Sequence, residues 1–115
     1  MKDQIKHTLT AMRERIERGW TQYAPARDIA GQIVLDHSKA EFICLDVALR
    51  QVQPDCDVMN ATNDYLVAYI RANLTPQYHT LIGFNDDRET TKASVLAAID
   101  GAIASLEEHK HSEYQ

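Results

Sequence analysis

Cysteine is scarce in this sequence, and the two that occur form no metal-binding or redox motif. Cys44 and Cys56 are the only cysteines in 115 residues, and their spacing is not Cys-x-x-Cys. The first residues, Met1 to Lys6, enter a mixed-charge pattern without the apolar segment of an export signal. We therefore expect two free thiols in a reducing compartment, which predicts a cytoplasmic protein.

Long hydrophobic runs are also absent. The longest uncharged apolar windows, Phe42 to Leu45 and Val95 to Ile99, are far shorter than the roughly 20 residues that a membrane-spanning helix needs. The sequence therefore predicts no membrane-spanning segment and no membrane partner.

Positive charge is scarce over most of the chain. The net charge is -5, and residues 1–27 carry six Lys and Arg against three Asp and Glu, whereas residues 28–115 carry six against fourteen. Nucleic-acid binding draws much of its affinity from cations that neutralise phosphates, so this balance disfavours general nucleic-acid binding. The basic segment is diluted by Glu14 and Glu17, and we interpret it as a solvated helix face.

No signature of a common enzyme class or metal site occurs. The sequence has no Gly-x-Gly-x-x-Gly, Walker loop or Gly-x-Ser-x-Gly, so the usual nucleotide and hydrolase motifs are missing. His79 with Asp86 and Asp87 could be drawn as metal ligands. So could His109 with His111, but neither spacing matches a zinc signature. We assign no catalytic residue, no metal and no cofactor, and we favour a protein that is not an enzyme.

Hydrophobic residues make up 44% and charged residues 25% of the chain, which is typical of a globular domain. Apolar spacing predicts helices over residues 3–18, 38–52, about 60–73 and 91–109. The first has its apolar stripe at Ile5, Leu9, Met12 and Ile16. We predict a mainly α single domain of about four helices over residues 1–109, with a short β or irregular insertion after the first helix and a disordered tail at 110–115.

The segments between these helices carry weaker signals. Residues 32–35 are rich in β-branched side chains and predict a short strand or small hairpin. Ser38, with Glu41 three residues later, has the pattern of a capping box and predicts the start of the second helix. Pro54 lies in a predicted linker at residues 53–57, and the third helix is expected to begin at about Asn60 or Thr62. Residues 77–89 are expected to be irregular, with a short extended piece at 78–82.

Two features are predicted for the second helix besides its apolar stripe. Cys44 lies among apolar residues and has no neighbouring cation, so we expect a small buried hydrophobe and not a nucleophile. Asp46 and Arg50 are four residues apart, which predicts a modest ion pair on the polar face.

The densest polar cluster is the turn at residues 82–91, just before the last helix. Helix-start chemistry explains it, because a Thr N-cap bonds free amide groups, acidic side chains favour the positive helix end, and Phe84 would be a core anchor. The alternative is a binding site whose polar side chains line a cleft and hold a small polar ligand or a partner. The residues of that site would be Trp20, Gln22, Asn85, Asp86 and Arg88.

Four motifs occur in a characteristic order. They are Gly19-Trp20-x-Gln22, Asp28-x-x-Gly31, Phe42-x-Cys44-x-x-x-Ala48-Leu49 and Phe84-Asn85-Asp86-x-x-x-Thr90-x-x-x-x-Val95. Over about residues 5–106 the chain resembles a family of small uncharacterised proteins, a domain-of-unknown-function family of bacterial and bacteriophage genomes. It departs from the pattern at Phe84, where Trp is usual, and at Asp46-Val47, where a small Gly-Ala pair is usual. The resemblance implies a fold unit and a phage or mobile-element setting, without an activity.

These observations favour a small non-catalytic binding module that sequesters a small polar ligand or inhibits a host defence protein, in the host cytoplasm if phage-encoded. One alternative is a small enzyme that acts on a nucleotide-like substrate through Asn85, Asp86 and Arg88, or through His79. Another is a structural or oligomeric accessory protein, for which Tyr65 or Tyr69 would be natural interface anchors.

Overall fold

Five α-helices and one two-stranded sheet form the part of the chain that the computed structural model describes, which is the backbone of residues 1–112 and the side chains of residues 1–108. In chain order the elements are α1 (Lys2–Arg18), β1 (Ala26–Arg27), the 3₁₀ helix η1 (His37–Lys39), β2 (Phe42–Ile43), α2 (Leu45–Val52), α3 (Cys56–Asn73), α4 (Leu81–Asn85) and α5 (Lys92–Ser112). The mainly helical fold with a small β insertion after the first helix is confirmed.

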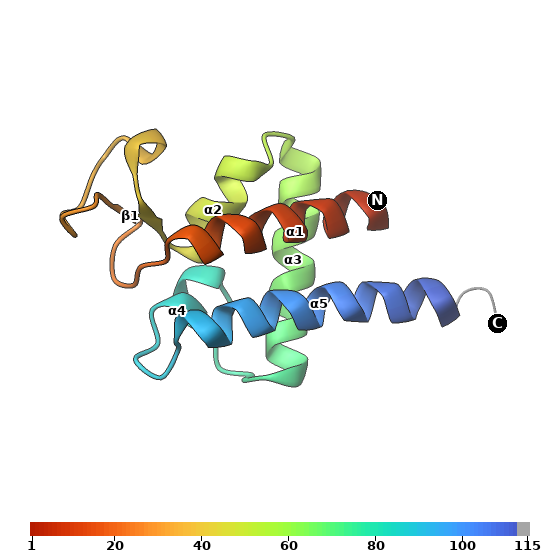
Figure 1. Cartoon of the computed structure of the whole chain (residues 1–115). Coiled ribbons are helices and arrows are strands. Elements are labelled where there is room, and N and C mark those ends of the chain that lie inside the picture. The colour runs from red at the N-terminus through yellow and green to blue at the C-terminus, as the bar shows by residue number, and fades with distance from the viewer. Residues whose placement is uncertain (113–115) are drawn as a thin grey trace.

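α1 and α5 lie side by side and run in opposite directions, and α3 crosses both (Figure 1). Every residue of the apolar stripe predicted in the first helix is buried, namely Ile5, Leu9, Met12 and Ile16. α3 and α5 face this stripe with buried side chains that include Leu66, Ile70, Val95 and Ile99. Burial of each such side chain stabilises the fold by roughly 1.5–3 kcal/mol. None of the helices, over their described residues, has the length and apolar character needed to cross a membrane.

The tyrosines proposed as interface anchors contact α5 of the same chain. Tyr65 donates a hydrogen bond to Ser105 Oγ at 2.9 Å, and Tyr69 lies against Gly101. Both tyrosines are half-buried against the core. Their main contacts are therefore within the domain.

β2 is held against the end of α1 by backbone contacts. β1 and β2 are antiparallel, and the paired residues are Ala26 with Ile43 and Arg27 with Phe42. The Ile43 N–H donates to the Gly19 carbonyl at 3.1 Å, and the Ile43 carbonyl accepts from the Thr21 N–H at 3.1 Å. Gly19 lies so close to the strand that a Cβ there would overlap the Glu41 carbonyl oxygen. These contacts fix the direction of the chain through Trp20.

The second helix starts later than the capping-box pattern predicts. Asp36, not Ser38, caps the short helix η1, because its Oδ1 accepts from the Ser38 N–H at 3.1 Å. The Glu41 N–H then bonds the Arg27 carbonyl at 3.0 Å, which draws the chain into the sheet. α2 begins only at Leu45, after β2.

Three other boundaries differ from the sequence predictions. The strand that follows α1 is at residues 26–27 and not 32–35, where Ile33 makes only an isolated bridge to Arg27. α3 begins at Cys56 because the Asp55 carboxylate accepts from the Val58 N–H at 3.0 Å. Residues 113–115, the end of the expected tail, lie outside the described residues, and α5 continues to Ser112.

The helix α4 replaces the irregular or extended chain expected at residues 78–85. Thr80 caps it, because its Oγ1 accepts from the Gly83 N–H at 3.0 Å. Leu81 and Phe84 are buried in the core, so the predicted anchor role of Phe84 is confirmed. The helix is too short to be recognised from apolar spacing.

We expect Gly19→Ala to destabilise the protein by about 1–3 kcal/mol, because the added methyl group would displace the backbone of β2. Gly19 has φ of -179°, which any residue adopts, so crowding and not backbone strain is the cause. Urea unfolding measures the change. The exposed Gln4→Ala on α1 is the control and should shift stability by less than about 0.5 kcal/mol. Equal stability of the two variants would contradict the close approach.

Candidate functional site

The carboxamide of Asn85 is fully buried, and protein groups occupy all of its hydrogen-bonding positions. Its Oδ1 accepts from the Trp20 indole Nε1 at 2.7 Å and from the Leu45 backbone N–H at 3.0 Å. Its Nδ2 donates to the Thr21 carbonyl at 3.1 Å and to Asp86 Oδ1 at 2.9 Å. A carboxamide has two donors and two lone pairs, so none remains for a ligand. Asn85 joins the chain after α1, the start of α2 and the end of α4.

The side chain of Gln22 clamps the turn between α4 and α5. Its Nε2 lies 2.8–3.0 Å from the carbonyl oxygens of Asn85, Asp87 and Thr90. Within the turn, the Thr90 hydroxyl donates to the Phe84 carbonyl at 2.8 Å. This polar turn is thus held by a side chain that precedes it by more than 60 residues in the sequence.

Asp86 bonds the segment that follows Trp20. Its Oδ1 accepts from the Tyr23 N–H at 3.0 Å, while no described residue donates to its Oδ2. Tyr23 has φ of 64°, in the left-handed region, which costs a bulky residue about 1–3 kcal/mol. The bond to Asp86 helps to hold Tyr23 in this conformation.

The carboxylate of Asp87 has partners of its own on the other side of the turn. The hydroxyl of Tyr78 donates to Asp87 Oδ2, and the Glu89 N–H donates to Asp87 Oδ1 at 2.6 Å. These bonds, that of Tyr78 above all, lower the pKa of Asp87 below its usual value. Asp86 and Asp87 therefore bond different segments and do not form a carboxylate pair.

The start of α5 is capped, but not by the acidic residues of the turn. Thr91 Oγ1 accepts from the Ser94 N–H at 3.1 Å, as expected of a Thr N-cap. The first turn of α5 holds no acidic side chain, because the helix begins at Lys92, after all three carboxylates. The expected interaction of Asp86, Asp87 and Glu89 with the helix end stays a prediction, and Asp86 and Asp87 bond other segments.

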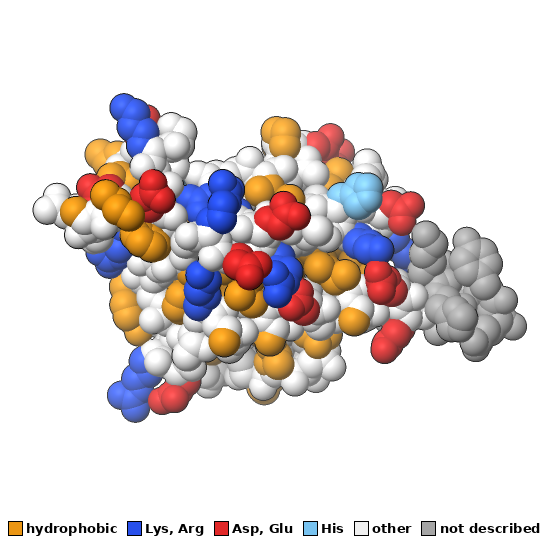
Figure 2. All heavy atoms as spheres, in the orientation of Figure 1, with side chains coloured by type: hydrophobic (Ala, Val, Ile, Leu, Met, Phe, Trp, Pro, Cys, Tyr) orange, Lys and Arg blue, Asp and Glu red, His pale blue; other side chains and the backbone are white. Residues whose placement is uncertain are grey.

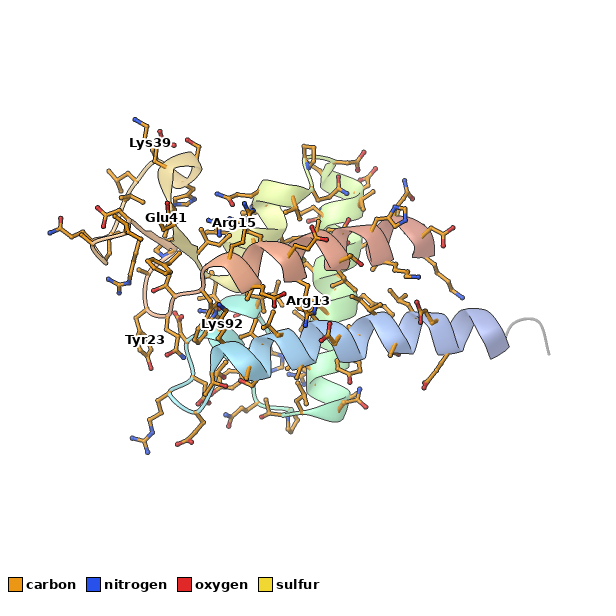
Figure 3. All side chains as sticks on the ribbon, viewed as in Figure 1. Arg13, Arg15, Tyr23, Lys39, Glu41 and Lys92 are labelled. Carbon is orange, nitrogen blue, oxygen red and sulfur yellow. The ribbon has the colours of Figure 1, made fainter. Side chains whose placement is uncertain are left out.

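A cavity of about 350 Å³ lies beside Asp86. Its walls come from the chain just before β1, from η1, from the start of α2 and from α4. The lining residues are Tyr23, Ala24, Pro25, His37, Cys44, Asp46, Val47, Arg50, Ile82 and Asp86. Tyr23 lies at the end of the molecule opposite the chain termini (Figures 1 and 3). We call this hollow the Asp86 cavity.

The Asp86 cavity has an apolar wall with three charged side chains. The Arg50 Nε donates to Asp46 Oδ2 at 2.9 Å, which confirms the predicted ion pair. With Asp86 added, the formal charge of these three groups is -1. Cys44 is buried as predicted, and burial raises the pKa of its thiol, so the thiol is protonated at neutral pH.

The structure brings together four of the five residues predicted to form a binding site. Trp20, Gln22, Asn85 and Asp86 form one hydrogen-bonded network, of which only Asp86 lines the cavity. The Arg88 side chain is 89% exposed, and its one ion pair among the described residues is with Glu89, at 3.8 Å from Nε. Sequence reasoning missed the lining residues Tyr23 and Ile82, which no local pattern marks.

A family model described as a family of unknown function, DUF6197, matches residues 1–105. The chain belongs to the DUF6197 family. All four motifs and every residue of the Asp86 cavity lie within this match. No curated protein and no solved structure matches the chain.

The side chains considered as metal ligands do not form a metal site in the described part of this DUF6197 protein. Over residues 1–108, no three His, Cys, Asp or Glu side chains are arranged to hold a metal ion. The ring nitrogen Nδ1 of His79 lies 2.9 Å from Arg71 Nη1, and no hydrogen bond joins His79 to Asp86 or Asp87 among the described residues. The side chains of His109 and His111 lie outside the described residues.

We expect Asn85→Ala to lower the free energy of unfolding by about 2–4 kcal/mol, because the indole of Trp20 and the N–H of Leu45 would lose their buried acceptor. Urea unfolding followed by Trp20 fluorescence measures it. Arg88→Ala, in the same turn, is the control and should change stability by less than about 0.5 kcal/mol. A loss no larger than the control's would contradict the central role of Asn85.

Tyr78→Phe should raise the pKa of Asp87 toward its ordinary value, because the largest cause of its depression is removed. In the native protein this depressed pKa adds stability at pH values above the unfolded pKa of about 3.9, and the stability is lost as the pH falls through the folded pKa. Carboxyl NMR titration measures the shift. Asp36, whose pKa is lowered by Ser38, should titrate identically in both proteins. An unchanged pKa of Asp87 in Tyr78→Phe would contradict the role assigned to Tyr78.

Proposed function

We propose that this protein is a non-catalytic binding module that holds a small polar ligand in the Asp86 cavity. The observation that carries the proposal is the carboxylate of Asp86. Its Oδ1 is held by Tyr23 and Asn85, while its Oδ2 accepts no bond from a described residue, so it can accept one from a ligand. A preformed hollow with few fixed polar groups is the usual form of a small-molecule site.

The charge of the cavity favours a ligand with a cationic head and an apolar body. Asp46 already pairs with Arg50, which leaves the Asp86 carboxylate as the uncompensated charge of the wall. A protonated amine would donate to Asp86, and hydrogen bonds between ionised groups are about twice as strong as neutral ones. The apolar part of the ligand would contact Val47, Ile82 and the ring of Tyr23.

The same groups favour binding over catalysis. The protonated thiol of Cys44 is a poor nucleophile, because the thiolate is the reactive form. Asp87 is bonded by Tyr78, and Asn85 is saturated by protein groups, so neither is free to act on a substrate. The saturation of Asn85 weighs against the alternative of an enzyme that uses Asn85, Asp86 and Arg88 on a nucleotide-like substrate.

A second candidate function, inhibition of a host protein, is favoured by apolar side chains near the same end of the molecule. Ile29, Ile33 and Leu35 are 78%, 59% and 96% exposed on the loop between β1 and η1. Hydrophobic side chains gather over this end on the face drawn in Figure 2. Exposed apolar groups of this kind often mark protein interaction sites.

The cellular setting is part of the proposal. Cys44 and Cys56 are both free thiols, which fits the reducing cytoplasm of a bacterial host. The phage-associated setting rests on the resemblance of the motifs. The acidic chain would meet a basic host surface with favourable long-range attraction, which mainly speeds encounter.

The ligand class is testable with amines of graded apolar size. We expect tyramine, agmatine and putrescine to perturb the NMR signals of Tyr23, Cys44 and Ile82, with the aromatic amine binding most tightly. Asp86→Asn keeps the acceptor for the Tyr23 N–H but removes the charge, and it should weaken binding by about tenfold or more. Asp64→Asn on the exposed face of α3 makes the same charge change away from the cavity and should have no effect.

Two results would contradict the proposed function. One is that no amine perturbs the cavity signals. The other is that Asp86→Asn and Asp64→Asn bind the amines equally, because binding would then depend on overall charge and not on the cavity.

A further inference from the structure

A second cavity, of about 310 Å³, lies next to the first and has the opposite charge. It is lined by Arg15 and Arg18 of α1, by His37 and Ser38 of η1, and by Glu41 and Gln51. His37 lines both cavities. Arg15, Glu41 and Lys39 are labelled in Figure 3, where Arg15 points from α1 toward the chain that carries Glu41.

Arg15 is a buried cation without a carboxylate partner. Arg15 is only 9% exposed, and no acidic group among the described residues forms an ion pair with it. Its guanidinium donates to Gln51 Oε1 at 3.3 Å and to the carbonyls of Glu41 at 3.3 Å and Ala40 at 3.0 Å. All three acceptors are neutral. A buried charge is normally paired, because its desolvation costs several kcal/mol.

The surroundings of Arg15 further disfavour its charged form. Burial lowers the pKa of Arg15, the charge of Arg18 lowers it further, and the Glu41 carboxylate opposes both without reversing them. Two arginines against one glutamate leave the lining with a formal charge of +1.

The hydrogen bonds of Arg15 leave part of its guanidinium free. The group has five N–H donors, and the three bonds start from three different nitrogens. One N–H on each of Nη1 and Nη2 therefore lacks an acceptor among the described residues. Arg15 ties α1 to α2 and to the chain just before β2, which accounts for the three bonds but not for the free donors or for Arg18 beside them.

We propose that this cavity binds a small oxyanion, a phosphate or carboxylate group, between the guanidinium groups of Arg15 and Arg18. The guanidinium fork matches the oxygens of either group. The anion would supply the counter-charge that Arg15 lacks. This site is separate from the Asp86 cavity and does not depend on the function proposed for it.

Titration of the ¹⁵N-labelled protein with inorganic phosphate and, separately, with acetate tests the site at constant ionic strength. We expect a saturable shift of the Arg15 Nε–H and Gln51 side-chain amide signals with at least one of the two anions. The anion that binds more tightly identifies the group that the site prefers. Absence of saturation with both anions would overturn the proposal.

Substitutions at three positions change the charge in or near the cavity, two by removing a cation and one by removing an anion. Arg18→Gln should weaken anion binding by about tenfold, because one charged hydrogen bond is lost. Arg13→Gln makes the same charge change on α1 outside the cavity and should alter binding less than twofold. Glu41→Gln removes the carboxylate of the lining and should tighten binding severalfold. Equal effects of Arg18→Gln and Arg13→Gln, or no tightening by Glu41→Gln, would show general charge attraction and contradict a site.

Discussion

The structure depends on one buried carboxamide, that of Asn85. Its four hydrogen bonds reach the Trp20 indole, the Thr21 carbonyl, the Leu45 N–H and the Asp86 carboxylate, so one side chain connects three segments that are far apart in the sequence. Without it the Trp20 indole N–H and the Leu45 N–H would lose their acceptor, and an unsatisfied buried polar group costs about 1–3 kcal/mol. No other residue type offers two donors and two acceptors in so small a volume at this point. Asn85 is therefore a structural residue first.

The Asp86 cavity follows from this constraint. Because Asn85 and the Tyr23 N–H both bond Asp86 Oδ1, the carboxylate is held with its other oxygen unbonded by described residues. The Gly19 contact with the chain at Glu41 brings η1 and the start of α2 to the same end of the domain. Two hollows result, one with an uncompensated carboxylate and one with an uncompensated guanidinium, and His37 lines both. Both ligand sites that we propose rest on these two uncompensated groups.

The sequence predicted the features that depend on residues close together in the chain. The apolar spacing of α1, the burial of Cys44 and Phe84, the Asp46–Arg50 pair and the Thr91 cap all follow from residues within a few positions of one another. The motifs also suggested that Trp20 and Gln22 belong with Asn85 and Asp86. The features that the sequence did not predict have other causes. The backbone bond between Glu41 and Arg27 delays the start of α2, and it joins residues far apart in the chain. The helix α4 is too short for a periodic signal, and no residue pattern marks the left-handed conformation of Tyr23. Arg88 was grouped with the site by proximity in sequence alone, and its side chain points to solvent.

Hydrogen exchange of the Trp20 indole N–H tests the central role of Asn85. The chain has a single tryptophan, so the indole N–H of Trp20 gives one unambiguous NMR signal. If its bond to the buried Asn85 Oδ1 holds as described, exchange of this proton with solvent deuterium requires opening of the fold, and it should be at least about a thousandfold slower than in free indole. Exchange at the rate of free indole would contradict the account.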